Sequence, residues 1–154
     1  MKIYIGTDHA GFELKEELKI FLENRGCDVE DKGAFEFNAA DDYPDFIYPV
    51  VKAVAEDLVR DLDSRGIVIG GSGQGEAIVA NKVKGIRAAV VYDEYSAKMS
   101  REHNDANILS LGTRTLSIGE AKDLVTLWLE TPFSNEERHK RRIDKIKAIE
   151  NDNL

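Results

Sequence analysis

A glycine-rich loop that ends in a glutamate has residue types and a spacing that could do chemistry. Residues 66–69 form an apolar run, the next seven residues read Gly-Gly-Ser-Gly-Gln-Gly-Glu, and a helical pattern follows. Glycines let the backbone turn successive N–H groups toward an anion, and the start of a helix adds roughly half a positive charge. The order of strand, loop and helix therefore predicts a cradle for an anion with the carboxylate of Glu76 beside it.

Two familiar glycine motifs do not account for this loop. A P-loop would end in Gly-Lys followed by Ser or Thr, whereas residues 75–77 read Gly-Glu-Ala. In the dinucleotide pattern G-x-G-x-x-G that starts at Gly71, the third glycine position holds Glu76, which would repel a pyrophosphate. We interpret the loop as the site of another anion. A tight turn followed by an ordinary first-turn acid stays as the alternative.

Composition limits the classes to which the chain could belong. With 154 residues, 42% of them hydrophobic, we expect one domain, residues 1–154, with a substantial core. The net charge of −8 argues against nucleic acid or an anionic membrane as a partner. The single cysteine, Cys27, excludes an internal disulfide and a cysteine metal cluster. Since the chain shows neither a long apolar run nor a leader pattern, we expect a cytoplasmic protein.

Short β-type runs alternate with helical patterns along the chain. Strands are expected at residues 3–6, 28–32, 66–70, 87–92 and 108–112. Helices are expected at residues 11–25, 43–62, 75–82, 94–102, 118–130 and 135–149. This alternation predicts a parallel sheet with helices on both faces and a ligand site beyond the carboxyl ends of the strands.

Three motifs are expected together at that edge of the sheet. Residues 7–11, Thr-Asp-His-Ala-Gly, follow the first strand, the glycine loop follows the third, and residues 112–114, Gly-Thr-Arg, follow the fifth. Asp8 and His9 could be mistaken for metal ligands. The chain has three histidines and no obvious third and fourth ligand at helical spacing, so we expect no metal. Hydroxyl and phosphate recognition is the role expected of both residues.

The last helix carries a basic segment in an otherwise acidic chain. Ser134 and Glu137 have the spacing of a capping box at its start. Arg138 and Arg142 are four residues apart, so they share a face and could bind one phosphate together. A solvated basic face with weak surface ion pairs is the alternative. His139 could join the phosphate site or lie in solvent.

Four segments, taken in order, resemble one family over nearly the whole chain: residues 6–11, 70–82, 101–107 and 138–144. The chain is similar to ribose-5-phosphate isomerases of the B type, a family that includes galactose-6-phosphate isomerase subunits and isomerases of other phosphorylated sugars. The resemblance implies a three-layer α/β/α sandwich with a flavodoxin-like, Rossmann-type sheet of order 2-1-3-4-5. It implies a homodimer, sometimes paired further into a tetramer, with active sites between subunits that the C-terminal helix reaches, and no metal or cofactor.

The resemblance also implies an activity, the interconversion of ribose 5-phosphate and ribulose 5-phosphate in the pentose phosphate pathway. Many members carry a cysteine base at the position of Gly70, whereas a second branch uses a glutamate at the position of Glu76, and this chain resembles that branch. His103 matches the acid that opens the sugar ring, Glu76 would move a proton through a cis-enediolate, and Ser72 could move one between its oxygens. Substrate contacts are implied for Asp8, His9, Gly71, Gly73, Gln74, Gly75, Asn104, Arg114, Arg138 and Arg142.

The residues leave several alternatives open. The same chemistry could act on a tetrulose 4-phosphate, allose 6-phosphate or galactose 6-phosphate, because a phosphate clamp and an enediolate loop serve sugars of several lengths. Residues 39–43 and Gln74 could set that length. A noncatalytic subunit of a mixed site is a further alternative, and so is a nucleotide- or flavin-binding module on the same kind of sheet.

Overall fold

The computed structural model describes residues 1–152. Its strands are β1 (Lys2–Thr7), β2 (Asp28–Asp31), β3 (Ser64–Gly70), β4 (Ala88–Val90) and β5 (Ile108–Gly112). Its α-helices are α1 (Phe12–Asn24), α2 (Pro44–Val59), α3 (Gln74–Ala80), α4 (Glu94–Glu102), α5 (Ile118–Glu130) and α6 (Glu137–Asn151). Every expected element is present, most with ends shifted by one to three residues.

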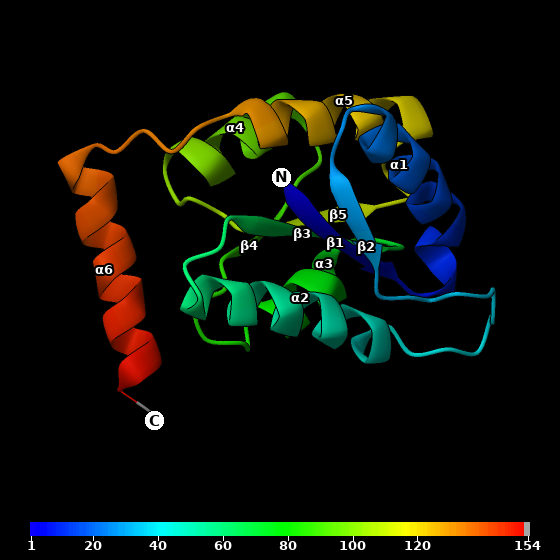
Figure 1. Ribbon diagram of the computed structural model, residues 1–154, viewed down its shortest axis with the longest axis horizontal. Helices are drawn as coiled ribbons and strands as arrows, with labels where there is room; N and C mark the ends of the chain where they lie inside the picture. Colours follow the sequence, from blue (N-terminus) through cyan, green and yellow to red (C-terminus); the bar gives the residue numbers. More distant parts are fainter. Residues whose placement is uncertain (153–154) are drawn as a thin grey trace.

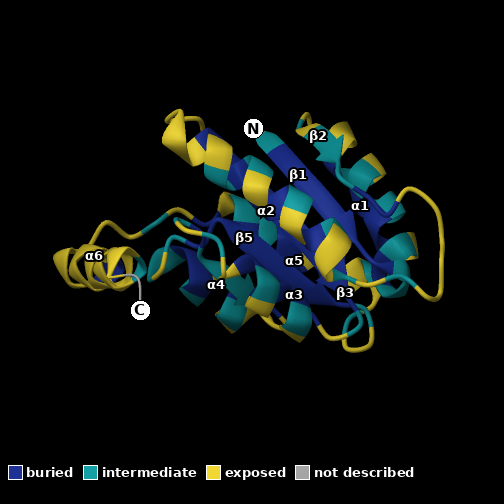
Figure 2. Cartoon of the chain, turned by 90° about the horizontal axis from the view of Figure 1, so that it is seen from below, coloured by how far each residue is buried: buried dark blue, intermediate teal, exposed yellow. Residues whose placement is uncertain are grey.

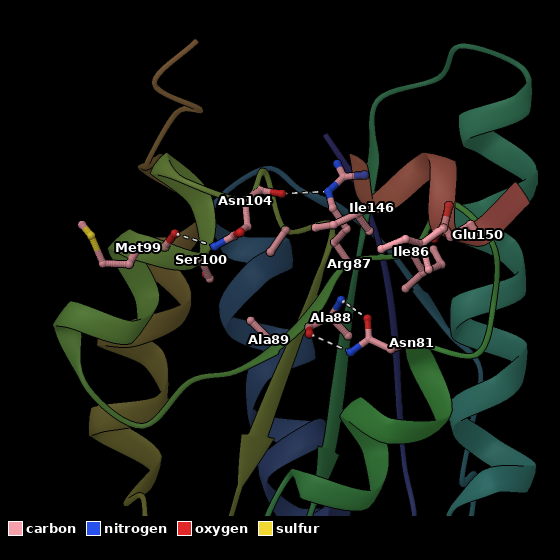
Figure 3. A pocket seen from close by; sticks show the side chains of 12 residues that line it. Asn81, Ile86, Arg87, Ala88, Ala89, Met99, Ser100, Asn104, Ile146 and Glu150 are labelled. Atoms are coloured by element: carbon pink, nitrogen blue, oxygen red, sulfur yellow. Dashed lines mark hydrogen bonds between the residues drawn. The ribbon is translucent and has the colours of Figure 1, made fainter. Parts of the chain in front are cut away.

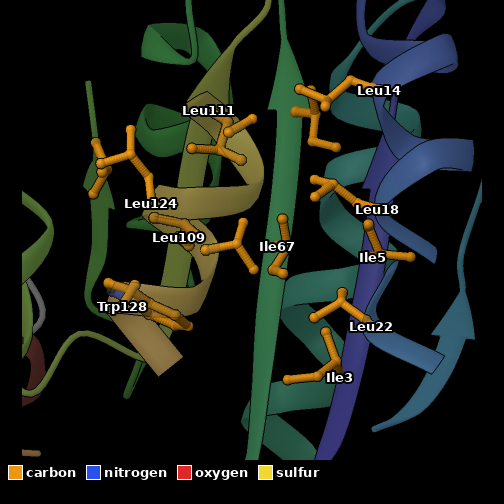
Figure 4. Close-up of a cluster of buried hydrophobic side chains, with 14 of the residues drawn as sticks. Ile3, Ile5, Leu14, Leu18, Leu22, Ile67, Leu109, Leu111, Leu124 and Trp128 are labelled. Atoms are coloured by element: carbon orange, nitrogen blue, oxygen red, sulfur yellow. The ribbon is translucent and has the colours of Figure 1, made fainter. Parts of the chain in front are cut away.

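The strands form one parallel sheet that lies between two layers of helices (Figure 1). Helices α1, α4 and α5 pack on one face, where residues 3, 5, 67, 69, 109 and 111 join the larger core (Figure 4). Helices α2 and α3 pack on the other face against Tyr4, Val68 and Ile108. The alternation of faces along each strand follows from the two-residue period of β structure. The predicted α/β class, parallel sheet and three layers are confirmed.

The order of the last two strands differs from the expected 2-1-3-4-5. The observed order is β2-β1-β3-β5-β4, so β5 is interior and β4 is an edge strand. Every residue of β5 is buried, whereas the three residues of β4 are only partly buried. An interior position in the sheet removes more of the apolar surface of β5 from water than an edge position would. This gain in hydrophobic burial favours the observed order.

Helix α6 stands apart from the sheet, and most of its surface is exposed (Figures 1 and 2). The capping box expected at its start does not form: the N-cap residue is Glu136, which makes no side-chain cap hydrogen bond. The Ser134 hydroxyl lies 2.8 Å from Nδ1 of His139 instead. Within residues 1–152, no helix has the length and apolar character needed to cross a membrane.

Candidate active site

The glycine loop lies at the carboxyl end of β3 and is held by the end of β5. The Ser110 hydroxyl donates to the carbonyl oxygen of Gly73 at 2.7 Å. The backbone N–H groups of Thr113 and Arg114 donate to the carbonyl oxygens of Gly70 and Gly71. Gly73 is the N-cap of α3 with φ of 77°, a left-handed conformation that favours glycine. The loop is therefore fixed by contacts far apart in the sequence.

Glu76 lies in the first turn of α3, and its side chain is folded back toward β3. The residue is 4% exposed. A methyl group added at Gly70 would overlap the Glu76 carboxylate, so the absence of a side chain at Gly70 makes room for it. Burial raises the pKa of Glu76 and the negative charge of Asp8 adds to this, while the N–H groups of Glu76 and Gly73 act in the opposite direction. A carboxylate with a raised pKa is a stronger base.

Asp8, His9 and Asp41 form a cluster beside this loop, in which His9 and Asp41 are hydrogen-bonded to each other. Asp8 accepts a hydrogen bond from the N–H of Ala10 and begins a short 3₁₀ turn, His9–Gly11. Nδ1 of His9 lies 2.6 Å from Oδ1 of Asp41, and the His9 backbone N–H donates to the same oxygen at 3.1 Å. The hydrogen bond to Asp41 is the main cause of the raised pKa of His9, which neighbouring Asp8 also favours.

Asp41 falls within residues 39–43, for which only an effect on substrate length was expected, because an aspartate in a polar loop is ordinary and nothing nearby in the chain marks it as a partner of His9. The expectation of no metal rested in part on the lack of a third ligand, and Asp41 bears on that point. Asp8, His9 and Asp41 each offer a potential ligand atom within 4.8 Å of the others, so a third group does exist. The short contact from Nδ1 to Asp41 is, however, a hydrogen bond that a metal ion would have to displace. In this structure Asp41 and His9 are joined by hydrogen bonds.

Arg114 and Tyr43 flank the loop. A methyl group at Gly71 would lie 3.0 Å from Cζ of Arg114, and one at Gly75 would lie 2.9 Å from the Tyr43 hydroxyl. Arg114 is also close enough to His9 to oppose the rise of its pKa. The expected residues Asp8, His9, Gly71, Gly73, Gly75, Glu76 and Arg114 thus share the carboxyl edge of the sheet, together with the exposed Ser72 and Gln74. The Ser72 hydroxyl accepts the Gln74 N–H at 3.2 Å.

A second cluster contains His103, which follows α4. The ring centroids of His103 and His139 are 4.2 Å apart, so the end of α4 meets the start of α6. His139 is only 1% exposed, and burial together with the charge of His103 lowers its pKa. Arg138 and Arg142 lie on the exposed surface of α6, where Arg138 pairs with Glu136 at 2.7 Å. In this chain His139 packs against His103 and is shielded from solvent.

The two clusters lie at opposite edges of the sheet. The carbonyl oxygen of Asn104, next to His103, accepts a hydrogen bond from Nε of Arg87, and Arg87 directly precedes β4 (Figure 3). Asn104 is therefore at the amino edge of the parallel sheet, whereas Glu76 lies beyond the carboxyl end of β3. One chain alone does not bring Glu76 and His103 together. The expected site residues occupy two half-sites.

A cavity borders the second half-site at Asn104 and does not reach Glu76. It measures about 590 Å³ and lies between β4, the end of α4 and α6 (Figure 3). Ala88, Met99 and Ile146 give it an apolar lining, and Arg87 and Asn104 stand at its side. Glu150 adds one carboxylate to this lining.

A buried carboxylate with a raised pKa, beside a glycine loop, an arginine and a histidine, defines an α/β protein with an acid–base site for an anionic small molecule. The comparisons with known proteins agree with this class. The model of the ribose/galactose isomerase family matches residues 3–146, and the chain belongs to that family.

Named relatives extend along nearly the whole chain. The ribose-5-phosphate isomerase B of Mycolicibacterium paratuberculosis is 45% identical over 97% of this chain and 92% of its own length. A structure of the Clostridium thermocellum ribose-5-phosphate isomerase B is 49% identical, covers both chains fully and has a TM-score of 0.91. That of the Mycoplasma genitalium enzyme with bound ribulose-5-phosphate is 39% identical, with a TM-score of 0.92 over 97% of this chain and 96% of its own.

Proposed function

We propose that this chain is an aldose–ketose isomerase that interconverts ribose 5-phosphate and ribulose 5-phosphate. Family membership and the relatives named above support this activity. The observation that carries it is the position of Glu76, buried against the glycine loop with a raised pKa. The whole chain serves as one catalytic domain, and we place it in the cytoplasm, consistent with its one free cysteine.

In this proposal Glu76 removes the C2 proton of the open-chain sugar and returns it to C1. The raised pKa makes proton abstraction easier near neutral pH, and one carboxylate can serve both carbons. The cis-enediolate between the two transfers carries negative charge on oxygen. N–H groups of residues 71–75 stabilise that charge, and a single such donor is worth about 3–4 kcal/mol in other enzymes. The exposed Ser72 hydroxyl moves a proton between the two oxygens.

Ring opening requires a second chain in this proposal. His103 is the acid, and its place at the opposite edge of the sheet means that it serves the Glu76 of a partner subunit. A twofold dimer, the commonest symmetric assembly, builds two such sites at once because each chain gives and receives the same surface. Arg138 and Arg142 on α6 would follow His103 into the partner's site, where they would meet Arg114 and bind the phosphate.

Steady-state kcat/KM of the purified protein tests the proposal. The substrates are ribose 5-phosphate, erythrulose 4-phosphate, allose 6-phosphate and galactose 6-phosphate. We expect preference for ribose 5-phosphate and near-complete loss of turnover in Glu76→Gln. The matched control is Glu23→Gln, which makes the same charge change on the exposed surface of α1 and should leave turnover unchanged. Full activity in Glu76→Gln would reject Glu76 as the base, and a clear preference for another sugar would correct the substrate.

A further inference from the structure

Asp41 holds His9 through two hydrogen bonds to a single carboxylate oxygen. The imidazole Nδ1 and the backbone N–H of His9 both point to Oδ1, at 2.6 and 3.1 Å. The Asp41 side chain is 6% exposed. Within residues 1–152 its other oxygen, Oδ2, has no hydrogen-bond partner. A buried acceptor without a donor is destabilising, so stability alone does not explain an aspartate at this position.

The loop that carries Asp41 is anchored to β1 and α1. The backbone N–H of Ala34 donates to the carbonyl oxygen of Thr7 at 2.7 Å. The buried ammonium group of Lys15 donates to the carbonyl oxygen of Ala34 at 2.6 Å and to Asp31. The Phe37 ring stands edge-on to the His9 ring with centroids 6.2 Å apart. These contacts hold the first part of the loop close to the end of β1, and Asp41 meets His9 farther along the same loop.

This geometry determines which ring nitrogen is available. Because Nδ1 faces Asp41, Nε2 is the ring nitrogen left free for another partner, and the His9 side chain as a whole is 32% exposed. The charged groups facing the ring are Asp41, Asp8 at 3.8 Å from Nδ1, and Arg114. The two carboxylates favour the imidazolium form, Arg114 opposes it, and the pKa of His9 is raised on balance. Where His9 is protonated, it and Arg114 place two cations beside the glycine loop.

We infer that Asp41 is a positioning residue that holds His9 as an imidazolium and turns its Nε2 toward the substrate phosphate, beside Arg114. The inference rests on the proposed function for the identity of the ligand. The arrangement of His9 and Arg114 describes a site for an oxyanion, so the binding of any tetrahedral dianion can test it. Asp41 would thus supply, within one chain, the negative charge that lets two cations stand together before the ligand arrives.

Binding of inorganic sulfate tests this inference without relying on turnover. Sulfate keeps its charge between pH 5.5 and 8, whereas phosphate itself titrates there. We expect Asp41→Asn, which retains the shape but loses the charge, to weaken sulfate binding about tenfold at pH 7.5, or about 1.4 kcal/mol. At pH 5.5 the difference should shrink, because His9 is then protonated in both proteins. Glu36→Gln, in the same loop but exposed, is the matched control.

The imidazole titration of His9 by NMR gives a second measurement that a merely structural role would not move. The midpoint should fall in Asp41→Asn and stay unchanged in Glu36→Gln, with the His9 signal identified by its loss in His9→Gln. In the isomerase assay KM should rise while kcat changes by less than about threefold. Equal sulfate affinity and equal His9 titration in Asp41→Asn and Glu36→Gln would overturn the inference. Sulfate binding and the His9 titration do not depend on isomerase activity. Failure of the proposed function can therefore be distinguished from failure of this inference.

Discussion

Mixed dimers of two inactive variants test whether the active site is divided between chains. One variant carries Glu76→Gln and the other His103→Asn. Because these residues lie at opposite edges of the sheet, a site formed across a twofold axis takes Glu76 from one chain and His103 from the other. In a mixed dimer, one site then receives both substitutions and the other receives neither.

The twofold symmetry of the dimer determines how much activity should return in the mixture. Random re-association of equal amounts gives about half mixed dimers, each with one intact site of two, so about one quarter of the wild-type activity returns. The assay is ribose 5-phosphate turnover after the two variants are unfolded and refolded together, with native mass spectrometry to count the mixed dimers. Each variant refolded alone gives the baseline.

The matched control pairs Glu76→Gln with Arg114→Ala. Both residues lie at the carboxyl edge of the sheet in the same chain. Every site in their mixed dimer therefore has one defect, and no recovery of activity is expected. Activity of the first mixture that stays at the mean of its parents, despite mixed dimers being present, would refute the divided site. It would mean that His103 acts within its own chain or takes no part in the reaction.

Three further perturbations follow from the site and the core. Gly70→Ala should lower kcat at least about 100-fold, because its methyl group displaces the Glu76 carboxylate and a shift of about 1 Å has that effect on rate. Since burial, together with the charge of Asp8, raises the pKa of Glu76, kcat/KM should fall with decreasing pH above the range of an ordinary glutamate, and Asp8→Asn should move this acid limb to lower pH. Lys15→Ala should reduce the free energy of unfolding by about 3 kcal/mol in urea denaturation, because it takes a buried ammonium group away from Asp31 and from the Ala34 carbonyl oxygen and leaves Lys19 as the remaining ammonium partner of Asp31.

Each of these predictions has a control and a contrary outcome. Gly119→Ala places a methyl group in open space on α5 and should leave kcat unchanged; equal rates for Gly119→Ala and Gly70→Ala would remove the steric argument. An acid limb that does not move in Asp8→Asn would show that the charge of Asp8 does not reach Glu76. Lys19→Ala removes a more exposed partner of the same aspartate and should cost less stability than Lys15→Ala. The reverse ranking would contradict the buried pair.

Much of this architecture could be read from hydrophobic periodicity. Local patterns predicted every helix and strand, because each must bury one face against the sheet or a helix layer. Strand order could not be read in the same way: the patterns of β4 and β5 look alike, and only the burial of all of β5 distinguishes them. The capping box at Ser134 failed for a related reason, since a contact with His139 competes with the local hydrogen bond.

The candidate site was predictable in its residues but not in their grouping. The glycine loop and Glu76 are neighbours in the sequence, and their chemistry follows from their spacing. Asp41 lies 32 residues from His9, and its partnership depends on how the loop after β2 returns to the end of β1. The separation of His103 from Glu76 depends on the direction of α4, which runs back toward the amino edge. Such long-range relations are set by topology.

The overlap between Gly70 and the Glu76 carboxylate also limits how such a loop could evolve. A side chain at position 70 and a glutamate folded back from position 76 compete for one volume, so a cysteine base at position 70 and a glutamate base at position 76, the two alternatives that the family resemblance implies, exclude each other in this geometry. A lineage that exchanges one base for the other needs two substitutions. If the side chain at position 70 is lost first, the loop has room but no base; if the glutamate is gained first, it meets an occupied space. The intermediate sequence has impaired catalysis on either route, which would keep the two branches apart.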